Sequence, residues 1–345
     1  MLKADMHCHS IYSEHPAEWF LQKLGARESY TDPFYIYDRA MKKGMDLVCV
    51  TDHNQIEGAL LLKEKHPSKV IVGVESTAYF PEDGCKIHIL IYGLNEMQFE
   101  MVNLIRNDIY ELRSYLLETG LTHSVAHASY SVNGKLNQQH LEKLILLFDV
   151  FESVNGGRNV LNNLGWKHIL DNLDAHLIES LYQKHRIQPA SDNPWIKGYT
   201  GGSDDHAGIF VGCTYTQAQA ANQAEFLEAI RGKQSAGYGR SNNFHSLAFS
   251  VYKIAYDFSR QQSKKKKGNP LLSSVTEALF EDRGVDLGNK LRIKTIRGLA
   301  DMRGDELKKN LADLLHTLNN SRDLDVDDKL DKVYLHISDL ADSYF

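Results

Sequence analysis

The sequence predicts an α/β fold in which parallel strands form a barrel. Short apolar runs alternate with stretches of helical spacing over residues 1–240, and this alternation indicates parallel strands joined by helical crossovers. Nearly every apolar run ends in a histidine, an aspartate or a glutamate. Polar side chains at the carboxyl ends of many parallel strands are typical of a barrel active site, so we expect one functional centre at that end of the barrel.

The first predicted strand leads into a pair of histidines. Leu2, Ala4 and Met6 alternate with polar residues, and His7 and His9 follow at a spacing of two. A helix would turn two such side chains about 200° apart, so only an extended or bent backbone lets them act together. Imidazole is the commonest metal-binding side chain near neutral pH. Taken alone, the pair is equally compatible with a metal site and with two surface histidines near the chain terminus.

The remaining elements follow in order along the chain. The long connection at 11–38 is rich in aromatic and acidic side chains, and we expect a short helix and a capping loop there, because long loops are usually functional. Apolar runs of the kind that a buried parallel strand needs predict strands over 46–51, 70–74, 86–93, 122–126, 147–151, 198–203 and 235–240. Helical spacing predicts helices up to 43, around 60–62 and over 96–118, 137–146, 157–185 and 222–232. Gly120 is expected to end one of these helices.

The candidate metal ligands lie at or near the ends of the predicted strands. They are His7, His9, Glu14 or His15, His53, Glu75, His88, His127, Asp204 and His206. So many ionisable groups cannot share one cavity without a compensating cation. A mixture of imidazoles and carboxylates suits Zn²⁺, Mn²⁺ or Fe rather than Ca²⁺. The set is too large for a single tetrahedral ion, so it predicts two or three divalent transition-metal ions that share ligands, an arrangement that suits phosphoryl displacement.

Composition places the protein in the cytoplasm and divides the chain in two. The 345 residues carry a formal net charge of −6, which argues against a surface generally coated with nucleic acid. No apolar run is long enough to span a bilayer, no signal peptide is expected, and the four scattered cysteines predict free thiols in a reducing compartment. Helical spacing without clustered ligand types predicts a helical C-terminal extension over 243–345, which could mediate self-association, after a catalytic domain over 1–242. The lysine run at 264–267 reads as a solvated linker more readily than as a nucleic-acid contact.

Four motifs in order resemble the PHP (polymerase and histidinol phosphatase) superfamily of metal-dependent phosphoesterases. They are His7-Cys8-His9-Ser10, Thr51-Asp52-His53, a lone His127 after an apolar strand, and Ser203-Asp204-Asp205-His206. The resemblance implies a distorted seven-stranded (β/α) barrel related to the TIM barrel, two or three ions, and hydrolysis of a phosphate ester by metal-bound hydroxide. Residues 18–31 also resemble a subgroup of PHP proteins associated with glycosyltransferases.

The resemblance also assigns roles to single residues. His7, His9, Glu75 and His127 would hold one or two ions, with His53, Asp204 and His206 completing the cluster and His88 on a further ion. Glu14 is the favoured ligand in the first loop, because a carboxylate is more frequent at that position than the imidazole that His15 offers. Two residues are candidates for catalytic roles outside the ligand set. Arg158 would clamp the substrate phosphate, unless it is a surface arginine at a helix start, and Asp52 would support the ligands.

Three functions remain open on the sequence alone. The first is hydrolysis of a small phosphomonoester such as a nucleotide or a sugar phosphate, which the acidic net charge favours. The second is an exonuclease or endonuclease that acts at a nucleic-acid end. The third is a non-catalytic module in which metal ions only stabilise the fold, and the intact ligand set argues against it.

Overall fold

The computed structural model describes residues 1–13 and 27–243, together with residues 246, 250, 253, 254 and 257. The chain divides into two units, Met1–Asn243 and Phe244–Phe345. The predicted ligand at Glu14 or His15, the lysine run and the helices predicted for the C-terminal extension lie outside the described residues. The first unit contains the sheet and the candidate centre.

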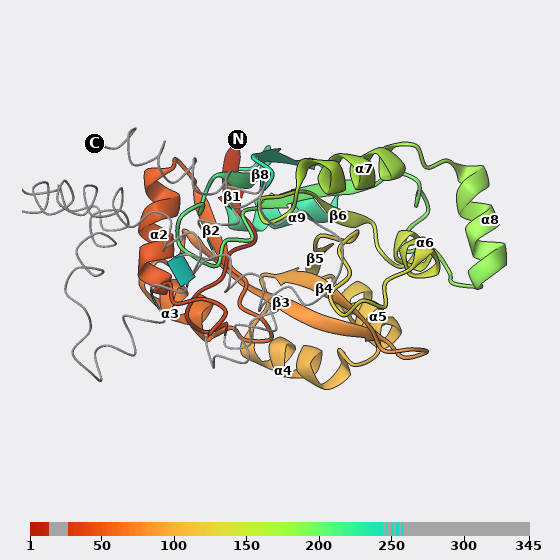
Figure 1. Ribbon diagram of the computed structural model, residues 1–345, viewed down its shortest axis with the longest axis horizontal. Coiled ribbons are helices and arrows are strands. Elements are labelled where there is room, and N and C mark those ends of the chain that lie inside the picture. Colours follow the sequence, from red (N-terminus) through yellow and green to blue (C-terminus); the bar gives the residue numbers. More distant parts are fainter. Residues whose placement is uncertain (14–26, 244–245, 247–249, 251–252, 255–256, 258–345) are drawn as a thin grey trace, which may run out of the picture. The chain divides into compact units, whose positions relative to one another are not determined.

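Within the described residues, nine strands form one sheet in the order β7-β6-β5-β4-β3-β2-β1-β8-β9. In chain order the strands are β1 (Leu2–Asp5), β2 (Leu47–Val50), β3 (Val70–Phe80), β4 (Cys85–Tyr92), β5 (Thr122–Val125), β6 (Val150–Asn155), β7 (Gly198–Gly202), β8 (Thr214–Ala218) and β9 (Ser235–Gly239). The helices are α2 (Pro33–Lys42), α3 (Glu57–Lys65), α4 (Glu96–Ile105), α5 (Ile109–Thr119), α6 (Gln138–Leu147), α7 (Val160–Asp171), α8 (Ala175–His185) and α9 (Gln223–Arg231). Figure 1 shows that these helices lie around the sheet.

The two ends of the sheet come together, which produces a nearly closed barrel. The Thr216 hydroxyl on β8 accepts a hydrogen bond from the Gly201 N–H of β7 at 2.8 Å and donates one to the Gly201 carbonyl at 2.9 Å. On β9, Ser235 Oγ donates to the Tyr199 carbonyl at 2.8 Å. A Cβ atom at Gly201 would lie 2.9 Å from the Tyr215 carbonyl oxygen, so this close approach requires glycine. The predicted α/β barrel is confirmed at this level.

The strand directions correct the prediction of a wholly parallel sheet. Neighbours among β1, β2 and β3 are parallel, and so are those among β5, β6 and β7. However, β4 is antiparallel to β3 and β5, and β8 is antiparallel to β1 and β9. Only residues 81–84 join β3 to β4, whereas parallel neighbours need a crossover of about a dozen residues or more. The described residues thus contain nine strands in place of the seven that the family resemblance implied.

Two predicted helices are interrupted by capping aspartates. The helix expected over 96–118 is split into α4 and α5, because the Asp108 side chain accepts hydrogen bonds from the first backbone N–H groups of α5. Gly120 ends α5 in the left-handed conformation, with a φ of 64°, as predicted. The helix expected over 157–185 is divided into α7 and α8 by Asp174 in the same way.

Strand side chains alternate between two buried clusters. On β2, Val48 belongs to the cluster between the sheet and the surrounding helices, whereas Leu47 belongs to a second cluster. This inner cluster joins residues from β1, β2, β3, β4, β6 and β8. Phe226 of α9 packs in this inner cluster. Met6 is also part of the inner cluster and immediately precedes His7. The candidate ligands therefore begin where the apolar interior stops.

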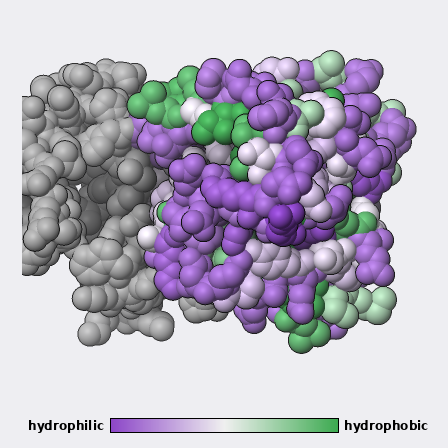
Figure 2. All heavy atoms as spheres, turned by 90° about the vertical axis from the view of Figure 1, so that its right-hand side faces the viewer, coloured by the Kyte–Doolittle hydropathy of each residue, from purple (hydrophilic) through white to green (hydrophobic). Residues whose placement is uncertain are grey.

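The outer surface is mainly hydrophilic, with a few hydrophobic patches, on the face that Figure 2 shows, which is the right-hand side of Figure 1, where α8 lies. That helix buries Ile178 and Leu181 and turns its other side to solvent.

Among the described helices, none combines the length and apolar character that a membrane span requires. The four cysteines are free, and Cys49 is buried, as predicted.

Candidate metal centre

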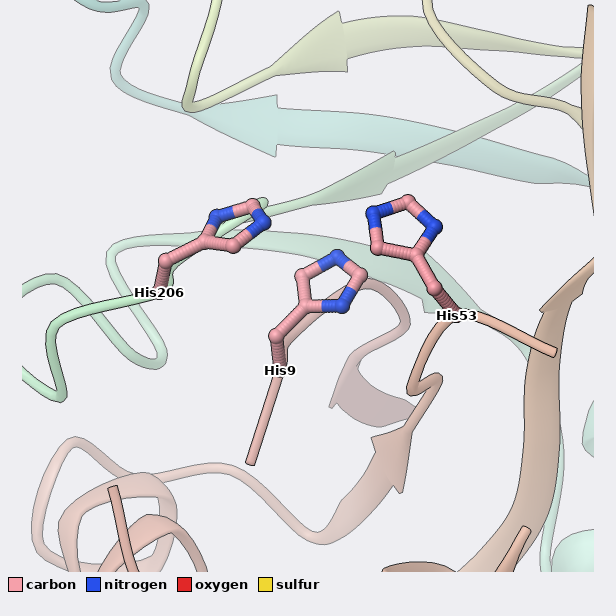
Figure 3. Close-up of side chains that lie close together, drawn as sticks. All are labelled: His9, His53 and His206. Carbon is pink, nitrogen blue, oxygen red and sulfur yellow. The ribbon is translucent and has the colours of Figure 1, made fainter. Parts of the chain in front are cut away.

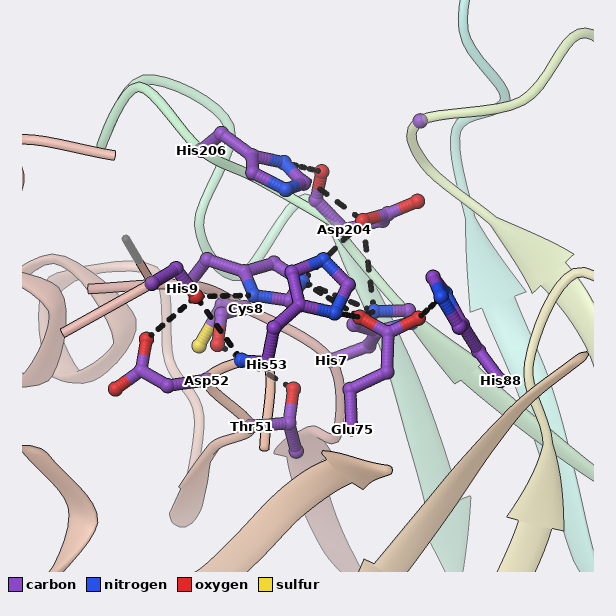
Figure 4. Close-up of polar contacts among 12 residues, drawn as sticks. His7, Cys8, His9, Thr51, Asp52, His53, Glu75, His88, Asp204 and His206 are labelled. Atoms are coloured by element: carbon purple, nitrogen blue, oxygen red, sulfur yellow. Dashed lines mark hydrogen bonds and ion pairs between the residues drawn. The ribbon is translucent and has the colours of Figure 1, made fainter. Parts of the chain in front are cut away.

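Polar side chains from β1 to β7 converge at one end of the barrel, as Figure 4 shows for most of them. The predicted ligands in the described residues all lie here, either on a strand or just after its end: His7, His9, His53, Glu75, His88, His127, Asp204 and His206. Four overlapping groups of three have donor atoms within 4.8 Å of one another and could each hold a metal ion.

Glu75 is the central carboxylate of this end of the barrel. Its Oε2 lies 3.1 Å from His7 Nε2 and 3.2 Å from His9 Nε2. Its Oε1 lies 3.0 Å from His127 Nε2 and 2.6 Å from His88 Nδ1. The side chain is fully buried. Oε2 also lies 3.2 Å from His53 Nδ1, so Oε1 faces two imidazoles and Oε2 faces three others. A carboxylate in this position can bridge two ions.

Asp204 completes the group around His7 and His9. Its Oδ1 lies 3.4 Å from His7 Nε2 and 3.5 Å from His9 Nε2, and these two nitrogens are 3.1 Å apart. Ligands about 2.1 Å from a tetrahedral ion lie about 3.4 Å from one another, so the spacing fits a common ion. Asp204 has a φ of 48°, a backbone conformation that is strained for a residue other than glycine and that clusters at functional sites.

One of the four groups consists of three imidazoles, those of His9, His53 and His206. Figure 3 shows that these side chains point toward one another. The ring centroid of His9 lies 4.1 Å from that of His206 and 4.7 Å from that of His53. The His53 and His206 side chains are 14% and 21% exposed, whereas that of His7 is 0% exposed. The centre is therefore open to solvent on this side.

Buried polar groups behind the ligands fix the orientation of the first two imidazoles. Glu152 Oε1 lies 3.0 Å from His7 Nδ1, and because a carboxylate only accepts, the proton of neutral His7 must be on Nδ1. On His9, Nδ1 lies 3.1 Å from Ser13 Oγ, and that hydroxyl donates to Asp52 Oδ1 at 3.1 Å. Such groups hold each imidazole in the tautomer that presents Nε2 to an ion.

Asp52 does not lie among the ligands. Its oxygens accept hydrogen bonds from the Ser10 backbone N–H and hydroxyl, both at 2.6 Å, and from the Ser13 hydroxyl. The side chain is buried and acts through Ser13 on His9. Its predicted catalytic role therefore stays a prediction, and the contacts favour a positioning role.

Opposing charges at this end of the barrel shift several pKa values. Burial by itself lowers the pKa of His9, but the carboxylates of Asp204 and Glu75 outweigh it and raise that pKa to about 10. The pKa of His7 is raised well above its ordinary value for the same reasons. Burial by itself would raise the pKa of Glu75, yet the surrounding imidazoles hold it well below its usual range. For His88 burial prevails and lowers the pKa to about 4. The buried carboxylates thus require positive charge, which protons or metal ions can supply.

Among the buried side-chain atoms of this region that lack a hydrogen bond are two that could bind an ion. His88 Nδ1 lies 2.6 Å from Glu75 Oε1 but makes no hydrogen bond with it, and Glu28 Oε2 likewise has no hydrogen-bond partner. The donor set of imidazoles and carboxylates is the one that Zn²⁺, Mn²⁺ and Fe prefer. On both observations the residues fit divalent transition-metal ions.

Arg158 lies beside this cluster, at the start of the segment that leads into α7. Its guanidinium stacks on the Tyr130 ring, 3.7 Å from the centroid, and Nη2 lies 3.6 Å from Asp204 Oδ2. The side chain is 25% exposed, so it borders the opening of the centre. The guanidinium thus lies next to the candidate ligands, and its role in binding phosphate stays a prediction.

Two glutamates of the centre were not among the predicted site residues. Glu152 lies on β6, and its Oε1 lies 3.0 Å from His7 Nδ1. Glu28 lies in the predicted capping loop, between His53 and His206. Glu28 does not follow any of the apolar runs that predicted strands, so the rule that ligands follow such runs could not identify it.

Comparisons with known proteins find only distant likenesses, and no family model matches the chain. The uncharacterised protein MJ1587 of Methanocaldococcus jannaschii is 36% identical over 77 residues, which are 21% of this chain and 43% of that protein. PsfC from Pseudomonas syringae is 15% identical, covers 75% of this chain and 98% of its own, and has a TM-score of 0.41. The lesion-specific endonuclease PfuEndoQ from Pyrococcus furiosus is 17% identical, covers 67% of this chain and 56% of its own, and has a TM-score of 0.36. These likenesses are too low to assign a family or an activity.

Proposed function

We propose that the protein is a metal-dependent phosphoester hydrolase of the PHP type. The observation that carries the proposal is the position of Glu75, whose Oε1 faces two imidazoles and whose Oε2 faces three others. Ions bound there would lower the pKa of a water molecule and neutralise charge on a phosphate, as two ions that share ligands do in phosphoryl displacement. Two or three ions of Zn²⁺, Mn²⁺ or Fe fit the donor set.

The chain's own residues bind and orient the substrate. Arg158 lies at the opening and presents its guanidinium, which can donate two parallel hydrogen bonds to phosphate oxygens. Tyr130 holds that guanidinium flat by stacking. Glu152 keeps the proton of His7 on Nδ1, and Asp52 acts through Ser13 to orient His9.

The substrate that we favour is a small phosphomonoester, such as a nucleotide or a sugar phosphate. A net charge of −6 repels the long phosphate backbone of a nucleic acid, because binding of that backbone depends on many lysine and arginine contacts. A small ester needs only the ions and one guanidinium.

A panel of three substrates tests the reaction. Purified protein is loaded with Mn²⁺ and assayed with p-nitrophenyl phosphate, bis-p-nitrophenyl phosphate and labelled single-stranded DNA. We expect turnover of the monoester. Turnover confined to the diester and the DNA would replace the favoured substrate with a nuclease substrate, and no turnover of any substrate by metal-loaded protein would favour the non-catalytic module.

Two variants test whether turnover depends on the candidate metal centre. His7→Ala/His9→Ala removes two buried donors and should abolish turnover, while His176→Ala changes an exposed histidine on α8 and should leave it unchanged. Full activity in the first variant would refute the metal mechanism.

A further inference from the structure

Glu28 lies between the two most exposed imidazoles of the centre. Its Oε2 is 3.1 Å from His53 Nε2 and its Oε1 is 3.3 Å from His206 Nε2. The residue is only 5% exposed, and Oε2 has no hydrogen-bond partner. A carboxylate that is buried and incompletely paired costs free energy, so its position calls for a binding partner.

The backbone around Glu28 is tied to the strand end that carries His9. Ser29 Oγ donates a hydrogen bond to the His9 carbonyl at 3.1 Å. The Ile11 N–H donates to the Thr31 carbonyl at 2.8 Å. These contacts anchor both sides of the first loop, so the Glu28 carboxylate is held at the centre by neighbouring backbone and not by its side chain alone.

The hydrogen-bond partners of the two imidazoles show what faces Glu28. His206 Nδ1 lies 3.1 Å from the Asp204 carbonyl oxygen, and His53 Nδ1 lies 3.2 Å from Glu75 Oε2. Both oxygens only accept, so each Nδ1 carries a proton and each neutral imidazole presents a lone pair on Nε2. Two lone pairs that face a carboxylate repel it unless a positive charge lies between them, and either a second proton on an imidazole or a metal ion would supply that charge.

His9 cannot supply the third donor as readily as Glu28 can. Its Nε2 already faces Glu75 and Asp204, and its Nδ1 lies against Ser13 Oγ. The ring stacks beside His206. Glu28 therefore offers a further donor, because one of its oxygens lies beside the Nε2 atom of each of the two imidazoles.

We propose that Glu28 is a metal ligand, which together with His53 and His206 holds one divalent ion at the solvent-facing side of the centre. The proposal rests on the proposed function and gives Glu28 the role that the sequence resemblance gave to Glu14 or His15. Three protein ligands leave a coordination position open, as in catalytic sites. Because His53 and His206 are the more exposed ligands, this open position would face the incoming phosphate.

Metal counting tests the assignment without any activity assay. Full-length protein is stripped with a chelator, reloaded with Mn²⁺ and dialysed, and the bound equivalents are counted by mass spectrometry. Glu28→Gln and His206→Ala should each bind one equivalent fewer than the unmodified protein, and the double variant should lose no more than either single variant. Glu28→His, which restores a donor, should recover the equivalent, and Glu100→Gln, an exposed control, should keep the full complement.

The outcomes distinguish the two proposals. If the unmodified protein binds no Mn²⁺, the proposed function fails and this assignment fails with it. If the unmodified protein binds Mn²⁺ and Glu28→Gln keeps every equivalent, only the assignment of Glu28 is overturned. Circular dichroism checks that the variants fold. Should they not, Mn²⁺ anomalous scattering from crystals of the unmodified protein decides. An ion about 2.2 Å from a Glu28 oxygen supports the assignment, and no ion within about 3 Å of either oxygen overturns it.

Discussion

Replacing Glu152 by glutamine tests how much the buried groups behind the ligands contribute to metal binding. Oε1 of Glu152 faces His7 Nδ1, while Oε2 accepts hydrogen bonds from the His127 backbone N–H at 3.0 Å and from Asn155 Nδ2 at 2.7 Å. The glutamine side chain has only one oxygen. The two donors that contact Oε2 in the unmodified protein require that oxygen to take the Oε2 position. The new NH₂ group must then point at His7, which forces Nδ1 to accept and moves the proton to Nε2, the atom that should bind the ion.

The expected loss follows from this change of tautomer. Removing a group that orients a metal-binding histidine typically costs about 10- to 100-fold in metal affinity, or about 1.4–2.7 kcal/mol. We expect Glu152→Gln at the upper end of that range, because the carboxylate is only 3% exposed and water cannot take its place. The folded structure should survive, since the two hydrogen bonds to Oε2 are retained.

Calorimetric titration of the chelator-stripped protein with Mn²⁺ measures the effect. The matched control is Glu142→Gln, because Glu142 Oε2 also contacts a histidine, His185, at 2.6 Å, but outside the centre. That variant should bind Mn²⁺ as the unmodified protein does. A Glu152→Gln protein that melts normally and binds Mn²⁺ within about twofold of the unmodified protein would contradict the tautomer argument.

Three further predictions concern stability and substrate binding. Burial lowers the pKa of Lys197 from 10.5 to about 8 in the folded protein, so the unfolded chain binds more protons between these values. The free energy of unfolding should therefore rise with pH across that window, by about 3 kcal/mol. Urea unfolding of Lys197→Met should lack this rise, and an equal pH dependence in both proteins would show the reasoning to be wrong. Arg158→Lys keeps the charge but loses the planar fork, and should raise KM for a phosphomonoester about tenfold or more, whereas Tyr130→Leu removes only the stacking and should raise it about two- to fivefold; unchanged KM in both variants would exclude the phosphate clamp. Gly202→Ala places a Cβ 2.2 Å from the Cβ of His7 and should lower both the melting temperature and the bound metal, and a variant with normal values would mean that the two strand ends can separate.

The sequence predicted those ligands whose position follows from a strand end. His7, Glu75 and His127 come directly at or after apolar runs, and the barrel brings them together. His88 was found in the same way, although its strand runs antiparallel. A histidine near the middle of an apolar strand reaches the centre from either strand direction, so the error in direction did not move the ligand.

The residues that were missed depend on contacts that no local pattern records. Glu28 reaches the centre because its loop docks on the first strand end, where Ser29 donates a hydrogen bond to the His9 carbonyl and the Thr31 carbonyl accepts one from the Ile11 N–H. The direction of β4 could have been predicted, since a connection of 81–84 is too short for a crossover. Sequence spacing reports which residues end a strand, whereas the docking of a loop depends on partners far along the chain.

The position of Asp204 beside His7 has a consequence for the order of folding. The Asp204 backbone N–H donates to the His7 carbonyl at 2.6 Å, so the chain after β7 closes on the chain after β1. When only the first half of the barrel has been synthesised, several imidazoles and Glu75 are already present. Asp204, which follows β7, is not. Closing a loop of that length is slow relative to local helix formation. Metal loading should therefore be a late event, coupled to closure of the barrel rather than to the appearance of the first histidines.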